Sequence, residues 1–308
     1  MAAMAFDAFA LMLAMLALGM LFARLRVFPE GAADTLNLVV LYVCLPAAIL
    51  VYVPRLRFEP DLLGLVAVPW LLAAASWLLL RLLAPRMRLR RDELGVLLLC
   101  TMLGNTSYIG YPMIEALLGA QALPYAVVYD QFGTFVMLST LGLVVLARYG
   151  GDAPPTARAI ALRIARFPPV WALVFGLTLM PEQPPTWIAS ALGQLASVML
   201  MLVMLAVGLT IQLRLPRDEI APLATGLLLK LVLLPALALA LALGFGMEGD
   251  IRHVAVLESA MPTMVTAAAL AISHRMAPRL AAALVGYGIV LAMVTLPAWH
   301  FVLQRLEG

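Results

Sequence analysis

Charged residues are scarce in this sequence of 308 residues, of which only 12% are charged and 64% are hydrophobic. A soluble domain has roughly 25% charged residues and about half apolar ones. The surplus of apolar residues needs lipid as its solvent, and one membrane-spanning helix uses about 20 of them. The sequence therefore predicts an all-α membrane protein whose spans use nearly the whole chain.

Motifs for catalysis and nucleotide binding are absent as well. The sequence has no HExxH pair, GxSxG elbow or Walker loop, so we expect neither an enzyme nor an ATP-driven pump. Its only cysteines, Cys44 and Cys100, lie in apolar runs, so no disulfide or metal site is expected. The net charge of +3 comes mostly from arginines in short loops and gives no indication of nucleic-acid binding. No cofactor is expected, with coupling to H+ or Na+ left open.

Hydropathy predicts ten transmembrane helices, of which the sixth is short and begins earlier, within 159–166. The spans are Ala5–Ala23, Leu36–Val53, Leu62–Leu83, Leu94–Leu118, Pro124–Ala147, Phe167–Met180, Trp187–Leu213, Ile220–Gly246, Ile251–Ser273 and Leu280–Val302.

Arginines in the loops predict the orientation, because basic residues favour the cytoplasmic side. With the N-terminus outside, the inside loops carry Arg24, Arg26, Arg86, Arg88, Arg90, Arg91, Arg148, Arg158, Arg163, Arg166, Arg214, Arg217, Arg275 and Arg279. The outside loops carry only Arg55, Arg57, Arg252 and Arg305. Both termini of this multi-pass protein are therefore predicted to lie outside the cytoplasm.

The stretch GGDAPPT marks a linker at 150–158 between two halves, 1–149 and 159–308. Five helices per half is an odd number, so a second copy enters the membrane inverted. A shift of 158 positions pairs Asp92 with Asp250, Gly104 with Pro262, Asn105 with Thr263 and Tyr129 with Tyr287. The sequence therefore predicts two inverted five-helix repeats.

The fourth and ninth spans contain residues that break helices at their centres. In the fourth span, 104–112 holds two glycines, a proline and several polar residues; in the ninth, Pro262 is followed by Thr263. In hydrocarbon, irregular backbone is tolerated only where protein or a watery cavity surrounds it. Interrupted helices at matching places indicate the substrate site of a transporter, whereas isolated prolines indicate ordinary kinks.

A half-helix presents unpaired N–H groups and partial positive charge at its N-terminus, which suits an anionic group. The predicted substrate-binding residues surround the two breaks. They are Gly104, Asn105, Thr106, Ser107, Tyr108, Pro112, Pro262, Thr263 and Met264.

Three of the ionisable residues inside spans are candidates for a functional role, because charge there is costly and indicates function. Lys230, the only lysine, either compensates an anionic substrate or is a structural partner. Asp130 is either a proton carrier or a partner of a helix N-terminus. Glu258, one turn before Pro262, either pairs with a basic group or carries a proton.

The motif GNTSYIGYPMIEALLG at 104–119 and the motif SAMPTMVTAAALA at 259–271 resemble the fourth-helix and ninth-helix motifs of the auxin efflux carrier family. That family includes the plant PIN proteins and many bacterial carboxylate carriers. The stretches VYDQFGT at 128–134, LKLVLLPAL at 229–237 and LNLVVLYVCLPAAIL at 36–50 add to the resemblance, which covers the whole chain.

The resemblance implies a fold like that of the PIN proteins and bile-acid symporters, in which helices 4 and 9 cross at their unwound centres. Helices 1, 2, 6 and 7 would form a scaffold, and helices 3–5 and 8–10 a transport domain that moves as an elevator. The family's crossover asparagine falls on Asn105 and its ninth-helix proline on Pro262. Gly104 and Thr263 depart from the plant pattern, and the long central loop of many plant members is missing.

These features favour a compact bacterial-type carrier of small organic anions, such as carboxylates or auxin-like acids, in the inner membrane. Secondary active and facilitative transport both stay open, and so does a homodimer. Two alternatives remain: a sodium-coupled symporter of the bile-acid type, and a membrane receptor or scaffold that binds a ligand without transporting it.

Overall fold

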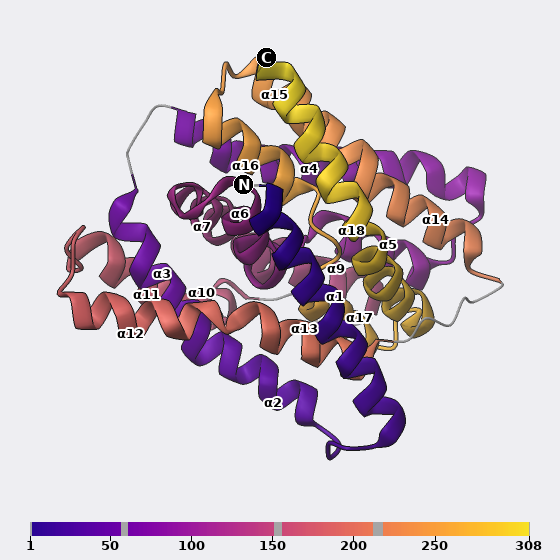
Figure 1. Ribbon diagram of the computed structural model, residues 1–308. Coiled ribbons are helices and arrows are strands. Elements are labelled where there is room, and N and C mark those ends of the chain that lie inside the picture. Colours follow the sequence, from indigo (N-terminus) through magenta and orange to yellow (C-terminus); the bar gives the residue numbers. More distant parts are fainter. Residues whose placement is uncertain (1, 57–60, 151–155, 212–217, 308) are drawn as a thin grey trace. The chain divides into compact units, whose positions relative to one another are not determined.

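A computed structural model describes residues 2–56, 61–150, 156–211 and 218–307 (Figure 1). These residues form helices and loops, with one isolated bridge between Gly104 and Thr263. Residues 151–155 of the predicted linker, and Arg57, Arg214 and Arg217 of the orientation count, lie outside the described residues.

The chain divides into two compact units. The first unit contains Met1–Phe58, Ser107–Val127 and Ile164–Ile211, and the second contains Glu59–Thr106, Val128–Arg163 and Gln212–Gly308. Each unit draws on residues from both sides of the predicted linker. The division into two inverted repeats stays a prediction.

Six helical stretches of the described chain are long and apolar enough to cross a membrane. They are Ala32–Arg55, Asp61–Met87, Ala120–Gly150, Thr186–Thr210, Ile220–Gly244 and Pro278–Leu306. Ala10–Leu25 and Pro168–Thr178, at the predicted first and sixth spans, are shorter apolar helices. The all-helical class is confirmed for the described residues and is compatible with a membrane protein, whereas the number of ten spans stays a prediction.

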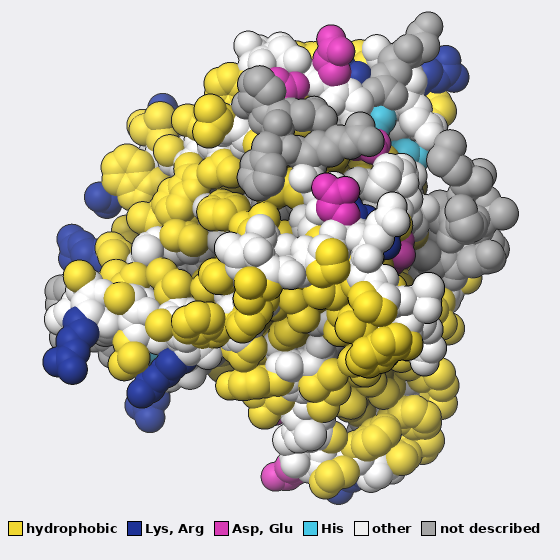
Figure 2. Space-filling view, turned by 90° about the vertical axis from the view of Figure 1, so that its left-hand side faces the viewer, with side chains coloured by type: hydrophobic (Ala, Val, Ile, Leu, Met, Phe, Trp, Pro, Cys, Tyr) yellow, Lys and Arg dark blue, Asp and Glu magenta, His cyan; other side chains and the backbone are white. Residues whose placement is uncertain are grey.

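Hydrophobic side chains cover much of the face shown in Figure 2. Both units expose large apolar residues: Trp187 of the first unit is 73% exposed, and Leu63 of the second is 80% exposed. In water such a surface would promote association, but lipid solvates it.

The first unit contains two helices whose backbones nearly touch. Its elements are α1 (Ala2–Leu25), α2 (Ala32–Val39), α3 (Leu45–Tyr52), α6 (Tyr111–Leu118), α11 (Pro168–Thr178), α12 (Thr186–Ser197) and α13 (Met199–Thr210). A Cβ added to Gly19 of α1 would lie 2.8 Å from Cα of Gly208 in α13. Small residues at such a contact are typical of helix packing in membranes.

The second unit surrounds the apolar helix α5 (Arg91–Met102). Leu97, Leu98 and Leu99 of α5 are at most 1% exposed and belong to one hydrophobic core. The other main helices are α4 (Asp61–Met87), α9 (Leu143–Gly150), α14 (Ile220–Leu228), α15 (Leu234–Gly244), α16 (Gly249–Ser259), α17 (Val265–Ser273) and α18 (Pro278–Glu307). The short α8 (Phe135–Met137) belongs to this unit as well, whereas α7 (Leu123–Tyr129) and α10 (Ala157–Ala165) run across unit boundaries.

Several spans contain π-helical segments, in which the turns are wider than in an α-helix. They are η1 (Val40–Cys44), η3 (Thr106–Gly110), η5 (Asp130–Thr134), η6 (Leu138–Gly142) and η7 (Leu229–Leu233). Pro46, Pro112 and Pro235 each stand two residues after such a segment. Proline has no N–H and displaces the preceding turn, so a widened turn before it accommodates the ring.

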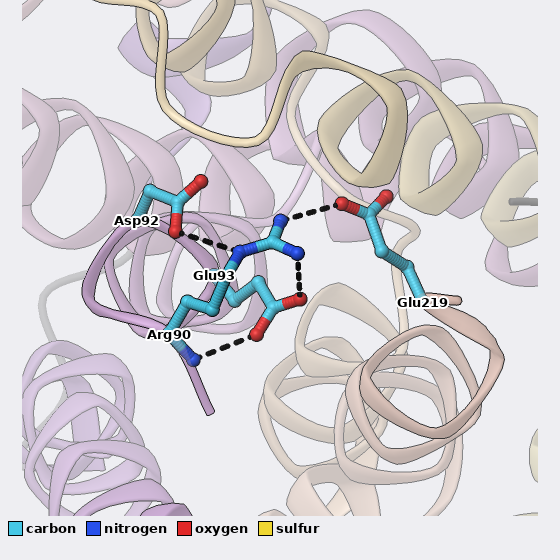
Figure 3. A network of polar contacts seen from close by, with 4 residues as sticks. All are labelled: Arg90, Asp92, Glu93 and Glu219. Atoms are coloured by element: carbon cyan, nitrogen blue, oxygen red, sulfur yellow. Dashed lines mark hydrogen bonds and ion pairs between the residues drawn. The ribbon is translucent and has the colours of Figure 1, made fainter. Parts of the chain in front are cut away.

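A polar network holds the start of α5 in the second unit (Figure 3). The backbone N–H of Arg90 donates to Glu93 at 2.7 Å, and the Arg90 guanidinium contacts Asp92 and Glu93 and donates to Glu219 at 2.9 Å. These hydrogen bonds with Asp92 and Glu219 raise the pKa of Arg90 above its ordinary value. The guanidinium therefore stays charged and joins the first turn of α5 to the residue that precedes α14.

Candidate functional site at two interrupted helices

The two predicted interruptions are both present, and they meet in the second unit. α5 ends at Met102, and α16 ends at Ser259 before α17 begins at Val265. The Asn105 N–H donates to the Pro262 carbonyl at 2.8 Å, and the Met264 N–H donates to the Leu103 carbonyl at 3.0 Å. Backbone groups freed by the two breaks thus satisfy each other, as a low-dielectric interior requires.

A threonine side chain satisfies another carbonyl at the end of α5. The last carbonyls of a helix have no partner within the helix. The Thr263 hydroxyl donates to the Cys100 carbonyl at 3.0 Å, and both residues are buried. The polar residue that follows Pro262 therefore holds the crossing together.

The single lysine lies at the C-terminal end of α16. Lys230, in η7, donates from Nζ to the carbonyl of Ser259 at 3.2 Å. A Cβ added to Gly104 would lie 3.0 Å from this Nζ, so the ammonium is directly beside the break that follows α5. The negative end of a helix dipole stabilises a cation, which gives Lys230 a structural partner within the crossing.

Asp130 joins the break to the π-helical segment η5. The Thr106 hydroxyl donates to one Asp130 oxygen at 2.5 Å, and the Gln131 amide donates to the other at 2.8 Å. All three residues are at most 3% exposed. Asp130 thereby fixes the first residue of η3, immediately after Asn105.

Three buried groups near the crossing have no hydrogen-bond partner among the described residues. They are Nδ2 of Asn105, Oε1 of Gln131 and both carboxylate oxygens of Glu258, a residue with no exposed surface. Glu258 interacts electrostatically with Lys230 and Asp130. Buried polar groups nearly always have a partner, so open donors and acceptors here indicate a place for a ligand, water, ion or proton.

Most of the predicted site residues lie in the second unit. These are Gly104, Asn105, Thr106, Asp130, Lys230, Glu258, Pro262, Thr263 and Met264, whereas Ser107, Tyr108 and Pro112 belong to the first unit. Sequence reasoning did not assign Cys100 and Ser259 to the site, because they contribute backbone carbonyls that side-chain identity does not reveal. The sequence offers Gln131, together with Glu258, only as an oxygen ligand for a coupling ion, and does not predict its hydrogen bond to Asp130.

The crossing combines an ammonium group and an open amide donor with two buried carboxyl groups. The first two groups can bind an anion, and the carboxyl groups can take up a proton or a cation. No group of three or more His, Cys, Asp or Glu residues that could hold a metal ion occurs in the part of the chain that the structure describes.

Comparison with known proteins agrees with a transport role. The family model described as "Membrane transport protein" matches residues 4–300. An uncharacterized transporter of Methanothermobacter thermautotrophicus is 30% identical over 294 residues, which cover 94% of this chain and 96% of the relative. An uncharacterized transporter of Methanocaldococcus jannaschii is 24% identical over 286 residues, covering 90% and 92%. The chain belongs to the membrane transport protein family, which is the auxin efflux carrier family that its two breaker motifs resemble.

Proposed function

We propose that this transporter is a secondary carrier of small organic anions, such as carboxylates or auxin-like acids, with its substrate site at the crossing. The single observation that supports this most is the buried Lys230 ammonium, which has a carbonyl partner and lies beside Gly104, the residue before Asn105 and its open side-chain amide. A carboxylate binds to an ammonium and an amide N–H through charge-assisted hydrogen bonds. Alternating access would follow an elevator movement, as the family resemblance implies.

Charge balance connects anion binding to coupling. Lys230 contributes one positive charge, whereas Asp130 and Glu258 contribute two negative charges when both are ionised. An anion that enters such a site is repelled unless a carboxyl group takes up a proton or a cation. We therefore assign the coupling role to Glu258, whose oxygens have no hydrogen-bond partner among the described residues.

A sodium-coupled symporter of the bile-acid type is the second candidate. The carboxyl oxygens of Glu258 and Oε1 of Gln131 are open acceptors in the described chain, and oxygen atoms are the ligands of hard cations. Anion uptake that depends on a sodium gradient rather than a proton gradient would favour this candidate.

The proposed function is tested by anion uptake in proteoliposomes. Asn105→Ala removes the open amide, Pro262→Ala changes the break in the ninth span, and Lys230→Met removes the ammonium at similar length. We expect Asn105→Ala and Lys230→Met to lower uptake of small carboxylates at least tenfold, because a hydrogen bond to a charged group contributes about 1.5–3 kcal/mol. Pro262→Ala should lower uptake because it changes the backbone at the crossing.

Asn37→Ala is the matched control, because Asn37 is the only other asparagine in the sequence and lies in α2 of the first unit. Its uptake should equal that of the unchanged protein. All variants must first insert in the membrane and elute as the unchanged protein does. Wild-type uptake by both Asn105→Ala and Lys230→Met would refute the proposed site.

A further inference from the structure

The first unit contains a cavity of about 270 Å³, whose lining includes Pro112 but none of the residues of the crossing in the second unit. Its walls come from α1, α3 and α6 and from the junction of α12 with α13. Most of the lining is apolar, including Leu11 and Leu200. The volume is just below the roughly 300–1,000 Å³ of ordinary ligand sites, so a small molecule would fill it.

A carboxylate and a phenol lie together in the cavity wall. The Tyr52 hydroxyl donates to Oε1 of Glu115 at 3.3 Å, and both residues line the cavity. Tyr52 is buried, while Glu115 is exposed. Since Tyr52 donates to one carboxylate oxygen only, the second is available to a ligand in the cavity.

Glu115 is the only charged residue among those that line the cavity. Arg55 is close enough to act electrostatically on Tyr52, but it forms no ion pair with Glu115 among the described residues. An anion in this cavity would face an uncompensated negative charge in apolar surroundings. A cation with an apolar body would instead match the carboxylate, the apolar wall and the nearby aromatic rings.

We propose that this cavity is a binding site for a small organic cation, with a primary ammonium group on Glu115 and a short alkyl chain against Leu11 and Leu200. The ammonium donates to the carboxylate, and Tyr52 keeps that carboxylate oriented through its hydroxyl. The site goes beyond the proposed anion carrier and does not depend on it, because every residue involved belongs to the first unit.

The test is equilibrium binding of n-butylammonium to the purified full-length protein, with 1-butanol and butyrate as probes of nearly the same size. We expect n-butylammonium to bind at least tenfold more tightly than 1-butanol, and butyrate not to bind in this cavity. Glu115→Gln keeps the shape and removes the charge, so it should weaken n-butylammonium binding about ten- to a hundredfold. Glu115→Asp restores the charge and should recover most of the affinity.

The matched control is Glu182→Gln, which removes an exposed carboxylate from the loop after α11 of the same unit. It should bind n-butylammonium as the unchanged protein does. Equal affinities for n-butylammonium and 1-butanol, or unchanged affinity in Glu115→Gln, would overturn the proposal. If Glu115→Gln does not fold, the affinities of the unchanged protein for the three probes still show whether the cavity prefers a cation.

The Asn105→Ala variant separates this inference from the proposed function. It should lose anion uptake and keep n-butylammonium binding, because the cavity lies outside the unit that contains Asn105. Loss of both properties in a folded Asn105→Ala protein would contradict the assignment of two separate sites.

Discussion

Single side chains at the crossing divide into those that hold the backbone and those that stay open. Thr263 donates to a carbonyl that the break of α5 has freed, and Lys230 donates to a carbonyl at the end of α16. Asn105 and Glu258 instead keep buried polar atoms without a partner among the described residues. Thr263 and Lys230 maintain the geometry; in the proposed function Lys230 also binds the anion together with Asn105, and Glu258 provides the coupling.

Glu258→Gln should uncouple transport from its driving gradient. The substitution keeps the shape of the side chain but removes the site at which a proton or cation neutralises the charge. We expect concentrative anion uptake driven by an imposed proton or sodium gradient to fall to the equilibrium level. Exchange of anion across the membrane needs no net coupling. Its rate should therefore stay within about threefold of the rate of the unchanged protein. Proteoliposomes with controlled internal and external solutions measure both quantities.

The control for this substitution is Asn37→Ala, which leaves the coupling carboxyl in place. If Glu258→Gln still accumulates anion against its gradient, Glu258 is not the coupling group. Loss of exchange together with accumulation would also contradict the prediction, because it would mean that Glu258 is needed for movement itself.

The sequence predicts which polar side chains belong to the crossing better than it predicts the backbone groups that they contact. Asn105, Lys230 and Glu258 stand out because a polar residue inside an apolar span is costly. The carbonyls of Cys100 and Ser259 could not be predicted, since every residue has a carbonyl and only the position of the break decides which ones become free.

Among the helices, the most informative feature is the contact between η7 and α18. An α-helix would pair the Leu231 carbonyl with the N–H of residue 235, and Pro235 has none. The indole of Trp299 in α18 donates to this carbonyl at 2.9 Å instead. Leu231 follows Lys230 directly, so Trp299 helps to fix the turn that positions the ammonium.

Trp299→Phe should destabilise the protein by about 0.5–1.5 kcal/mol, because it removes the hydrogen bond from the indole to the carbonyl of the buried Leu231. Pro235→Ala supplies a backbone N–H for the same carbonyl. In the double variant the loss should therefore be smaller than the sum of the two single effects. Reversible unfolding in denaturant measures the free energy of unfolding of the unchanged protein, the two single variants and the double variant, which together form a double-mutant cycle.

Trp187→Phe is the control, since the Trp187 side chain is 73% exposed and lies in the first unit. It should change the free energy of unfolding by less than about 0.5 kcal/mol. Strictly additive effects of Trp299→Phe and Pro235→Ala would show that the indole does not replace the missing N–H.

The breaks in the fourth and ninth spans could be predicted, because glycine, proline and short polar residues cluster there. The π-helical segments could not. Pro46, Pro112 and Pro235 each indicate only a local disturbance, whereas η5 and η6 have no proline two residues beyond their ends. A widened turn depends on packing around the helix as much as on its own residues.

Over the whole chain, the sequence established the membrane environment but not the two compact units. Their boundaries cut the fourth span between Thr106 and Ser107 and the fifth between Val127 and Val128. The first cut falls inside the polar break at 104–112, whereas the second lies in an apolar run, where composition does not indicate a boundary. The predicted membrane orientation depends on loop charge alone, and it can be tested directly.

We expect both termini to lie outside the cytoplasm. Cys44 and Cys100 are buried, so the unchanged protein gives little background with an impermeant maleimide. Leu306→Cys, at an exposed position near the end of α18, should be labelled in intact cells. Arg86→Cys, in the last turn of α4 at the end predicted to lie inside, should be labelled only after the membrane is made permeable.

The reverse pattern of labelling would mean that the orientation is inverted. Labelling of both positions in intact cells would contradict the predicted sidedness of at least one of them. Arg305, beside the labelled position, is one of the few arginines predicted to lie outside, so leaving it unchanged preserves the charge difference on which the prediction depends.

Lys230 is the only lysine in the sequence. Its ε-amine is therefore the only side-chain amine of this kind in the protein, and it lies beside Gly104, where the two interrupted helices meet. Reductive methylation with an isotope-enriched methyl donor would label the α-amino group and this one side chain. The nuclear magnetic resonance signal of Lys230 would then follow the interior of the crossing without any substitution.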